Sequence, residues 1–300
     1  MTVDLAGSCL DITTVRALQQ TYGQWSRMSM FCVADGHAGF RCSEYILHNL
    51  TSVFWATVKD VLSPANSTAE TDNSSPMQQG ATKFAEMTLS TATQQKDELI
   101  TAILKQTILT LDEIWLARVK NSRINDGSCV LVSLLIDDRW YFAHLGDCRA
   151  ICVRGNVAKN ITKDHTPGVD KVETERIEKA GGKVQKRGTI MRVIAGGTKI
   201  AVTRALGDAN MKRGVAPVLS SEADTTVIGA DKLGAEFTLV LVSDGVTSRL
   251  TNRAIAKCLR TGRQENHPNL SQYLVERAYQ NGSFDNITAL IIQPNGKEKQ

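Results

Sequence analysis

Four aspartates stand at the ends of short apolar runs, where a side chain can reach into a cleft. They are Asp35 after residues 31–34, Asp147 after 143–146, Asp244 after 239–243 and Asp285 before 286–287. If these chain segments converge, their carboxylates repel one another and require either protonation or bound cations. Ligation by carboxylate, carbonyl and water oxygens suits Mg²⁺ or Mn²⁺ and not zinc. The sequence therefore predicts a centre for hard divalent cations, the alternative for each Asp-Gly pair being an ordinary turn.

The elements that must position these aspartates are short β-strands. Runs of β-branched and aromatic residues recur from residue 127 onward, after one earlier run. They predict strands over residues 28–34, 129–136, 140–145, 149–153, 199–202, 237–242 and 287–292. Many short strands, with helices segregated in the sequence, predict an α+β fold: a central β-sandwich of two antiparallel sheets flanked by helices.

Helices are predicted where apolar residues recur at helical spacing. One stripe runs from Leu47 to Val58, and another runs from Ile100 to Trp115. Two further helices are expected over residues 170–180 and 270–279, the first ending at a Gly-Gly pair. These amphipathic helices need sheet faces to cover.

The length of the chain favours a single domain over residues 1–300, because 300 residues of which 42% are hydrophobic can bury one large core. Residues 63–96 are rich in Ser, Thr, Asn and Gln and poor in large apolar side chains. That composition predicts a mobile loop between the first two helices.

Composition also argues against several classes of partner. The 35 basic and 31 acidic residues are mixed, without a long basic run, so nucleic acid is not expected as a partner. No segment approaches the roughly 20 apolar residues that span a bilayer, and the start lacks a signal sequence, so no membrane association is expected. Seven cysteines without zinc-ligand spacing predict reduced thiols. We expect a cytoplasmic monomer, with a nuclear location left open.

A series of short motifs follows one order along nearly the whole chain. They are Asp-Gly-His-Ala-Gly at 35–39, Asp-Gly-Ser at 126–128, Gly-Asp-Cys-Arg at 146–149, Asp-His-Thr-Pro at 164–167, Glu-Arg-Ile at 175–177, Ala-Gly-Gly at 180–182, Thr-Arg-Ala-Leu-Gly-Asp at 203–208, Ser-Asp-Gly at 243–245 and Asp-Asn at 285–286. Single motifs of this set are weak signals, whereas the ordered set is specific. In this combination the sequence resembles the PP2C (PPM) family of metal-dependent protein serine/threonine phosphatases.

The resemblance implies a ligand role for each strand-end aspartate. Asp35 should bridge two metal ions, and Gly36 should offer its carbonyl to one of them. Asp244 and Asp285 should complete the other, and Asp147 should lie nearby as a ligand of a third ion. Two Mg²⁺ or Mn²⁺ ions are therefore expected as cofactors, and phosphoproteins are expected as substrates.

Two further residues receive catalytic roles from the resemblance. His37 would protonate the departing serine or threonine oxygen while a metal-activated water attacks phosphorus. Arg16 is the nearest match to the family's phosphate-binding arginine, and its planar fork suits a phosphate. Taken alone, a histidine at position 37 would more often be a residue at a helix start.

The sequence departs from the family at auxiliary ligand positions. Gln20 and Thr21 stand where the family has Glu-Asp, so the second metal is expected to bind weakly, and Ser248 replaces an aspartate associated with a third ion. Two hypotheses remain open. The chain is either an active phosphatase, weakened by these changes, or a pseudophosphatase that keeps the fold and serves as a protein-binding regulatory module.

Residues 171–201 are the candidate for a flap beside the cleft. The basic residues Lys183, Lys186, Arg187 and Arg192 lie in this stretch. They predict either attraction of acidic phosphopeptides or an ordinary solvated surface.

Overall fold

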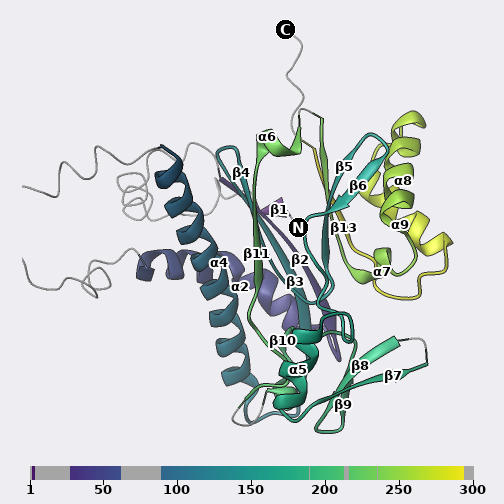
Figure 1. The fold of residues 1–300 in the computed structure, drawn as a ribbon. Helices are drawn as coiled ribbons and strands as arrows, with labels where there is room; N and C mark the ends of the chain where they lie inside the picture. Colours follow the sequence, from purple (N-terminus) through teal and green to yellow (C-terminus); the bar gives the residue numbers. More distant parts are fainter. Residues whose placement is uncertain are drawn as a thin grey trace, which may run out of the picture.

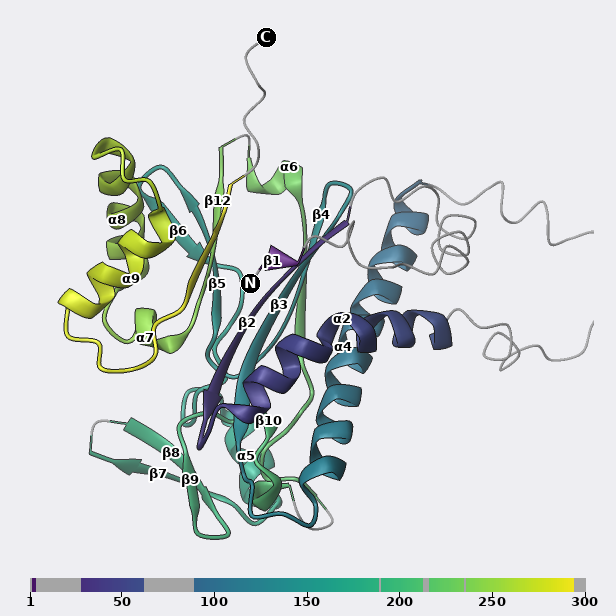
Figure 2. The same ribbon diagram turned by 180° about the vertical axis from the view of Figure 1, so that it is seen from behind.

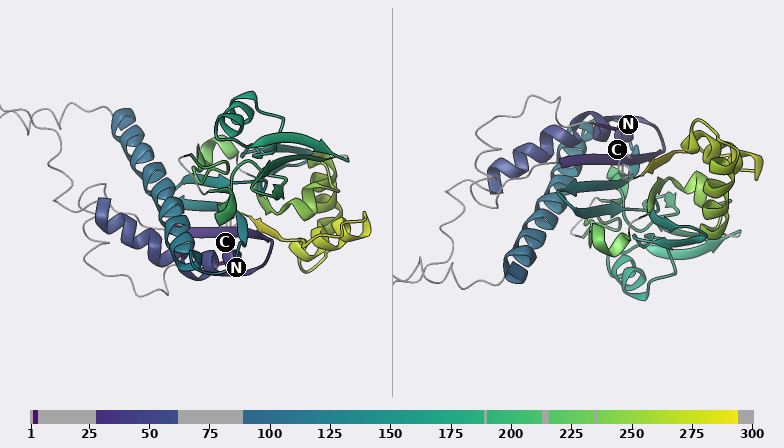
Figure 3. Two further views of the ribbon diagram at one scale, coloured as in Figure 1. Left: turned by 90° about the horizontal axis from the view of Figure 1, so that it is seen from below. Right: turned by 90° about the horizontal axis from the view of Figure 1, so that it is seen from above.

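Two antiparallel sheets lie face to face at the centre of the molecule, with helices on both outer sides (Figure 1). The computed structural model describes residues 2–3, 28–61, 89–188, 190–212, 216–234 and 236–293, with backbone alone at 2–3 and 89–92. Viewed along the vertical axis, the layers follow the order helix, sheet, sheet, helix (Figure 3). The predicted α+β sandwich is confirmed.

The larger sheet pairs an N-terminal strand with strands from the middle of the chain. Its order is β1-β2-β3-β4-β11, with β10 paired to β3. The strands are β1 (Thr2–Val3), β2 (Met28–His37), β3 (Gly127–Ile136), β4 (Arg139–Leu145), β10 (Leu206–Gly207) and β11 (Asp224–Gly229). In the β2–β3 register Asp35 lies opposite Cys129 and His37 lies opposite Gly127. This pairing sets the place where the first motif leaves the sheet.

The smaller sheet contains the strands next to Asp244 and Asp285. Its order is β13-β12-β5-β6, from β5 (Arg149–Arg154), β6 (Val157–Asn160), β12 (Thr238–Val242) and β13 (Ala289–Ile292). All five residues of β12 are buried. Leu239 and Leu241 join the core between the sheets, whereas Val240 and Val242 join the core under the helices. Burial on both faces explains why this strand reads as an unbroken apolar run.

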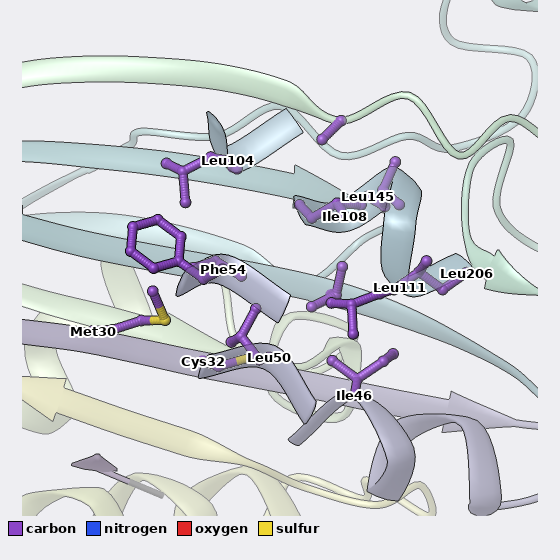
Figure 4. Close-up of a cluster of buried hydrophobic side chains, with 14 of the residues drawn as sticks. Met30, Cys32, Ile46, Leu50, Phe54, Leu104, Ile108, Leu111, Leu145 and Leu206 are labelled. Atoms are coloured by element: carbon purple, nitrogen blue, oxygen red, sulfur yellow. The ribbon is translucent and has the colours of Figure 1, made fainter. Parts of the chain in front are cut away.

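Four helices cover the outer faces of the two sheets. On the larger sheet lie α2 (Arg41–Val61) and α4 (Leu89–Val119), and on the smaller sheet lie α8 (Asn252–Gln264) and α9 (Leu270–Gln280). In Figure 4, Ile46, Leu50 and Phe54 of α2 meet side chains of α4 and of the sheet. Each such buried side chain stabilises the fold by about 1.5–3 kcal/mol. The helices predicted from the two apolar stripes, and those near residues 170 and 270, are confirmed.

A third, separate sheet lies below the lower ends of β2 and β5 (Figure 2). It contains β7 (Lys183–Arg187), β8 (Ile190–Ala195) and β9 (Thr198–Ile200) in that order, and we call it the flap sheet. The helix α5 (Lys171–Lys179) precedes it and begins at Asp170, whose carboxylate accepts a hydrogen bond from the Val172 N–H. Three short helices complete the described elements: η3 (Ala209–Met211), α6 (Ala230–Leu233) and α7 (Asp244–Thr247).

Two predicted boundaries differ from the structure by three residues or more. Strand β2 continues through residues 35–37 where a turn was predicted after Ala34, because these residues still pair with β3. The chain turns at Ala38, whose φ is 56°. Helix α4 begins at Leu89, so the end of the predicted loop at 63–96 is helical. A helix nucleated on the buried stripe propagates cheaply into neighbouring polar residues. The remainder of that loop, up to residue 88, lies outside the described residues.

No helix within the described ranges has the length and apolar character of a membrane span. The six cysteines in these ranges are all free thiols.

Candidate metal and phosphate site

Five aspartates line one cavity of about 350 Å³ between the sandwich and the flap sheet. Four are those predicted from the sequence: Asp35, Asp147, Asp244 and Asp285. The fifth is Asp208, and Gly36 and His37 line the same cavity. The structure therefore brings the described candidate residues together from four separate stretches of chain.

The loops that carry Asp244 and Asp285 are packed directly on each other. Asp244 is the first residue of α7, immediately after the turn that follows β12. A Cβ at Gly245 would lie 2.2 Å from the carbonyl oxygen of Asn286, so only glycine allows this approach. The Ser283 hydroxyl donates to the Gly245 carbonyl at 2.7 Å. This contact holds the two aspartates at one end of the smaller sheet.

The turn that carries Asp147 is anchored by a histidine from the Asp-His-Thr-Pro motif. The Gly146 N–H donates to Nδ1 of His165 at 3.1 Å, and the His165 N–H donates to the Gly146 carbonyl at 2.9 Å. The side chain of Cys129 lies beside this turn, since a Cβ at Gly146 would lie 2.2 Å from its Sγ. Sequence reasoning assigned no role to either His165 or Cys129.

The carboxylates in the cavity disfavour one another's ionisation. Burial raises the pKa of Asp35, and the charges of Asp244 and Asp147 raise it further. Burial and the Asp244 charge raise the pKa of Asp147 to about 6. The pKa of Asp244 is also raised, by burial and by Asp285. Among the described residues no basic side chain pairs with these groups. A crowded set of hard oxygen donors that no ion pair neutralises fits divalent cations such as Mg²⁺ or Mn²⁺.

His37 forms a close pair with Asp208. Its Nε2 lies 2.7 Å from Oδ2 of the buried aspartate, and because an ionised carboxylate only accepts, Nε2–H donates. Burial lowers the pKa of His37, but the hydrogen bond and charge of Asp208 outweigh burial, so the pKa lies above its ordinary value. A Cβ at Gly127 would lie 2.1 Å from Asp208 Oδ2 and 2.3 Å from His37 Nε2. The glycine therefore makes room for the pair.

Asp208 is itself fixed by two buried aspartates. The Gly207 N–H donates to Oδ1 of Asp112 at 2.7 Å, and the Asp208 N–H donates to the Asp126 carbonyl at 3.2 Å. The Asp126 carboxylate also accepts from the Arg41 N–H at the start of α2, at 3.1 Å. The chain segments around Asp112 and Asp126 thus hold in place the aspartate that contacts His37. Asp208 belonged to a recognised motif, but no signal in the sequence connected it with His37.

The auxiliary positions have different outcomes. Arg16, Gln20 and Thr21 lie outside the described residues. Ser248 is exposed at the end of α7, where its N–H donates to the Asp244 carbonyl at 2.8 Å. It is not among the described residues that line the cavity.

A second group of possible ligands lies away from the cavity. The ligand atoms of His144, His165 and Asp224 lie within 4.8 Å of one another. The two imidazole rings stack with centroids 4.7 Å apart and planes 7° apart. Because imidazole lone pairs lie in the ring plane, two parallel stacked rings do not point at one ion. His165 also has both nitrogens occupied, by Gly146 and by Asp224. The arrangement suits a hydrogen-bonded support for the Asp147 turn.

A larger hollow of about 500 Å³ lies between α2 and α4. Glu44 is the single carboxylate among the described residues that line it, so it offers no comparable cation site.

Comparison with known proteins assigns the chain to a family. The protein phosphatase 2C family model matches residues 8–287. The "Probable protein phosphatase 2C 74" of Oryza sativa subsp. japonica is 30% identical over 270 residues, which are 89% of this chain and 58% of that protein. The "Probable protein phosphatase 2C 69" of Arabidopsis thaliana is 31% identical, with 89% and 61% of the two chains covered. The chain thus spans about three fifths of the length of these relatives.

Solved structures share the fold at lower sequence identity. A serine-threonine phosphatase 2C from Toxoplasma gondii superposes with a TM-score of 0.68 at 20% identity, covering 89% of this chain and 86% of that one. A sex determining protein of C. elegans gives 0.66 at 22% identity, covering 92% and 58%. The protein described here belongs to the protein phosphatase 2C family.

Proposed function

We propose that this chain hydrolyses phosphoserine and phosphothreonine in proteins with the help of Mg²⁺ or Mn²⁺. The observation that carries the proposal is the convergence of Asp35, Asp147, Asp244 and Asp285 on one cavity. Their oxygens crowd together without a basic partner among the described residues. Buried carboxylates that repel one another are costly without cations, and such clusters are typical of metal-dependent hydrolytic sites.

The family resemblance supplies the ligand roles of groups that line this cavity. Asp35, Asp244, Asp285 and the Gly36 carbonyl would provide oxygen ligands to the ions, and Asp147 would lie nearby as a further ligand. When bound, the divalent cations supply charge neutralisation at the phosphoryl group and activation of a water nucleophile. Without the cations, the raised pKa values of Asp35 and Asp244 indicate that the neighbouring carboxylates repel one another when they are ionised.

His37 is the group on the cavity wall that can hold a proton for the leaving oxygen. The hydrogen bond from Nε2 to Asp208 fixes the ring, and the buried carboxylate favours the imidazolium form. A serine or threonine alkoxide is a poor leaving group, so protonation as the P–O bond breaks contributes about 10²–10⁴-fold to the rate. His37 would act as this acid, with Asp208 as its positioning residue.

The experiment that tests the proposal is hydrolysis of p-nitrophenyl phosphate across a Mn²⁺ titration. Wild-type protein should release nitrophenolate in proportion to bound Mn²⁺, and Asp244→Asn should lose this activity. Asp231→Asn makes the same chemical change on exposed α6 and should behave as wild type. Absence of hydrolysis at every Mn²⁺ concentration, with the folded state intact, would instead support the pseudophosphatase hypothesis.

A further inference from the structure

The flap sheet presents a strand edge to the carboxylate cavity. In the order β7-β8-β9, strand β9 pairs on one side only. On β8 the cavity is lined by the alternate residues Ile190 and Arg192, which share one face, whereas β9 lines it with all three of its residues, 198–200, followed by residues 201–202. Since successive side chains of a strand point to opposite faces, lining by consecutive residues means that the cavity runs along the backbone edge. An edge of this kind is a template for one more strand.

Two cations without partners stand beside this edge. Lys199 pairs with Ile194 in the β8–β9 register, and Arg192 lies two residues before Ile194, so the two basic side chains share a face. Both line the cavity. Within the part of the chain that the structure describes, neither forms an ion pair or a side-chain hydrogen bond. They are therefore available to an anionic ligand that enters the cavity.

We propose that the substrate segment is an extended phosphopeptide that adds to the edge of β9 as a further strand. Acidic side chains next to its phosphorylated residue contact Arg192 and Lys199. This inference rests on the proposed function and specifies the class of substrate that the site takes. Main-chain hydrogen bonds to the edge supply affinity, and the two cations supply selectivity for acidic flanks. Of the four basic flap residues noted in the sequence, only Arg192 lines the cavity, so the selective charge is localised to this pair.

The charge component is tested by peptide binding in the presence of Mn²⁺. The probe is a fluorescent peptide that carries a non-hydrolysable phosphonate analogue of phosphoserine with aspartates on both sides. Its affinity, measured by fluorescence anisotropy, should fall about tenfold in the double variant Arg192→Glu, Lys199→Glu. Lys186→Glu makes the same change on the same sheet without touching the cavity and should bind as wild type. The loss should disappear with an asparagine-flanked probe. The charge component is wrong if the double variant and Lys186→Glu lose peptide affinity equally, or if neither loses affinity.

The strand component is tested with peptides that carry a single backbone N-methyl group at successive positions. Strand addition uses the N–H of every second residue, so methylation should weaken binding about threefold to tenfold at alternate positions and little in between. Uniform tolerance along the peptide would overturn the strand geometry.

Failure of the inference and failure of the proposed function give different results. Mn²⁺-dependent release of nitrophenolate by wild-type protein tests the function without a peptide. Hydrolysis without Arg192-dependent peptide binding would sink the inference alone. Arg192-dependent binding without any hydrolysis would sink the function and leave the peptide site standing.

Discussion

His37 and Asp208 are 171 residues apart in the sequence, yet Nε2 of the histidine lies 2.7 Å from Oδ2 of the aspartate at the cavity wall. The aspartate side chain is 2% exposed and the histidine side chain is 29% exposed. The pair thus has a fixed inner end and an outer ring that reaches the cavity. This geometry separates a residue that would meet the substrate from one that would orient it.

Replacing His37 should affect substrates according to their leaving group. His37→Ala should reduce kcat/KM for a phosphoserine peptide by about 10²–10⁴-fold, because the alkoxide then leaves unprotonated. Hydrolysis of p-nitrophenyl phosphate should change little, because nitrophenolate is stable without a proton. His48→Ala, on the exposed side of α2, should leave both rates unchanged. Equal losses with both substrates would remove His37 from the role of acid.

Replacing Asp208 should reproduce the same pattern in weaker form. Asp208→Asn keeps a partner for the His37 ring but removes the charge, so kcat for the phosphoserine peptide should fall by about tenfold with KM unchanged. Gly127→Ala should give the same selective loss, because its Cβ would displace the pair. Thermal unfolding of both variants separates this effect from misfolding. A positioning role is contradicted if both substrates lose activity in parallel with stability.

Removing one carboxylate should stabilise the protein when metal is chelated. A carboxyl group whose pKa is raised in the folded protein destabilises the folded state once pH exceeds the pKa of that group in the unfolded chain. This destabilisation grows as pH rises towards the folded-state pKa, which is about 6 for Asp147. In chelator, Asp244→Asn should therefore increase the free energy of unfolding by about 1 kcal/mol at pH 8 and by less at pH 5. Added Mn²⁺ should stabilise wild type but not the variant. The free energy of unfolding is measured by denaturant unfolding. If Asp244→Asn were less stable than wild type in chelator, repulsion among the carboxylates would not be destabilising the folded protein.

The anchor of α5 should show the opposite dependence on pH. Glu173 is buried and accepts from Arg204 at 2.8 Å and from Arg176 at 3.1 Å. Burial raises its pKa, but the two arginines outweigh burial and lower it from 4.5 to about 2. Stability from this group is therefore full above pH 4.5 and lost as pH falls towards 2. Glu173→Gln should cost about 1–3 kcal/mol at pH 7.

The matched control for that variant is Glu178→Gln on the exposed side of the same helix. Urea unfolding at pH 7 and at pH 3 should show the gap between Glu173→Gln and wild type narrowing at the lower pH. A gap independent of pH would mean that shape, not charge, anchors α5.

The strands that carry the aspartates were predictable because strands buried on both faces have mostly apolar sequences. From residue 239 on, strand β12 reads as an apolar run since both of its faces are covered, and β3 is mostly apolar and buried in the same way. Of the flap strands, β9 was predicted in part by the run over residues 199–202, whereas β7 and β8 could not be found in this way. All residues of β7 but one are exposed, and its sequence, Lys-Val-Gln-Lys-Arg, is as polar as that of a loop. Only pairing with β8 gives it a strand conformation, and that pairing is not visible in local propensity.

Helix α8 was missed although its signals were present. Thr251 accepts from the Ala254 N–H as a cap, and Ile255 and Leu259 recur at helical spacing. The apolar stripe is short and lies among many basic and polar residues, which obscured the pattern.

The site itself was predictable in its parts and not in its assembly. Asp35, Asp244 and Asp285 stand out individually, but their convergence depends on contacts between distant segments, such as the approach of Gly245 to Asn286. The partnership of His37 with Asp208 depends on Gly127 and on strand register. Such relationships arise from packing across the two sheets, and a single sequence carries no record of them.

The central claim is that Asp35, Asp244 and Asp285 share divalent cations in one cavity. Its most direct test is crystallography of the protein with Mn²⁺, with anomalous scattering used to locate the ions. The account predicts anomalous peaks between these carboxylates, at about 2.0–2.2 Å from their oxygens. A cavity without such peaks at saturating Mn²⁺, or peaks found instead at His144, His165 and Asp224, would contradict it.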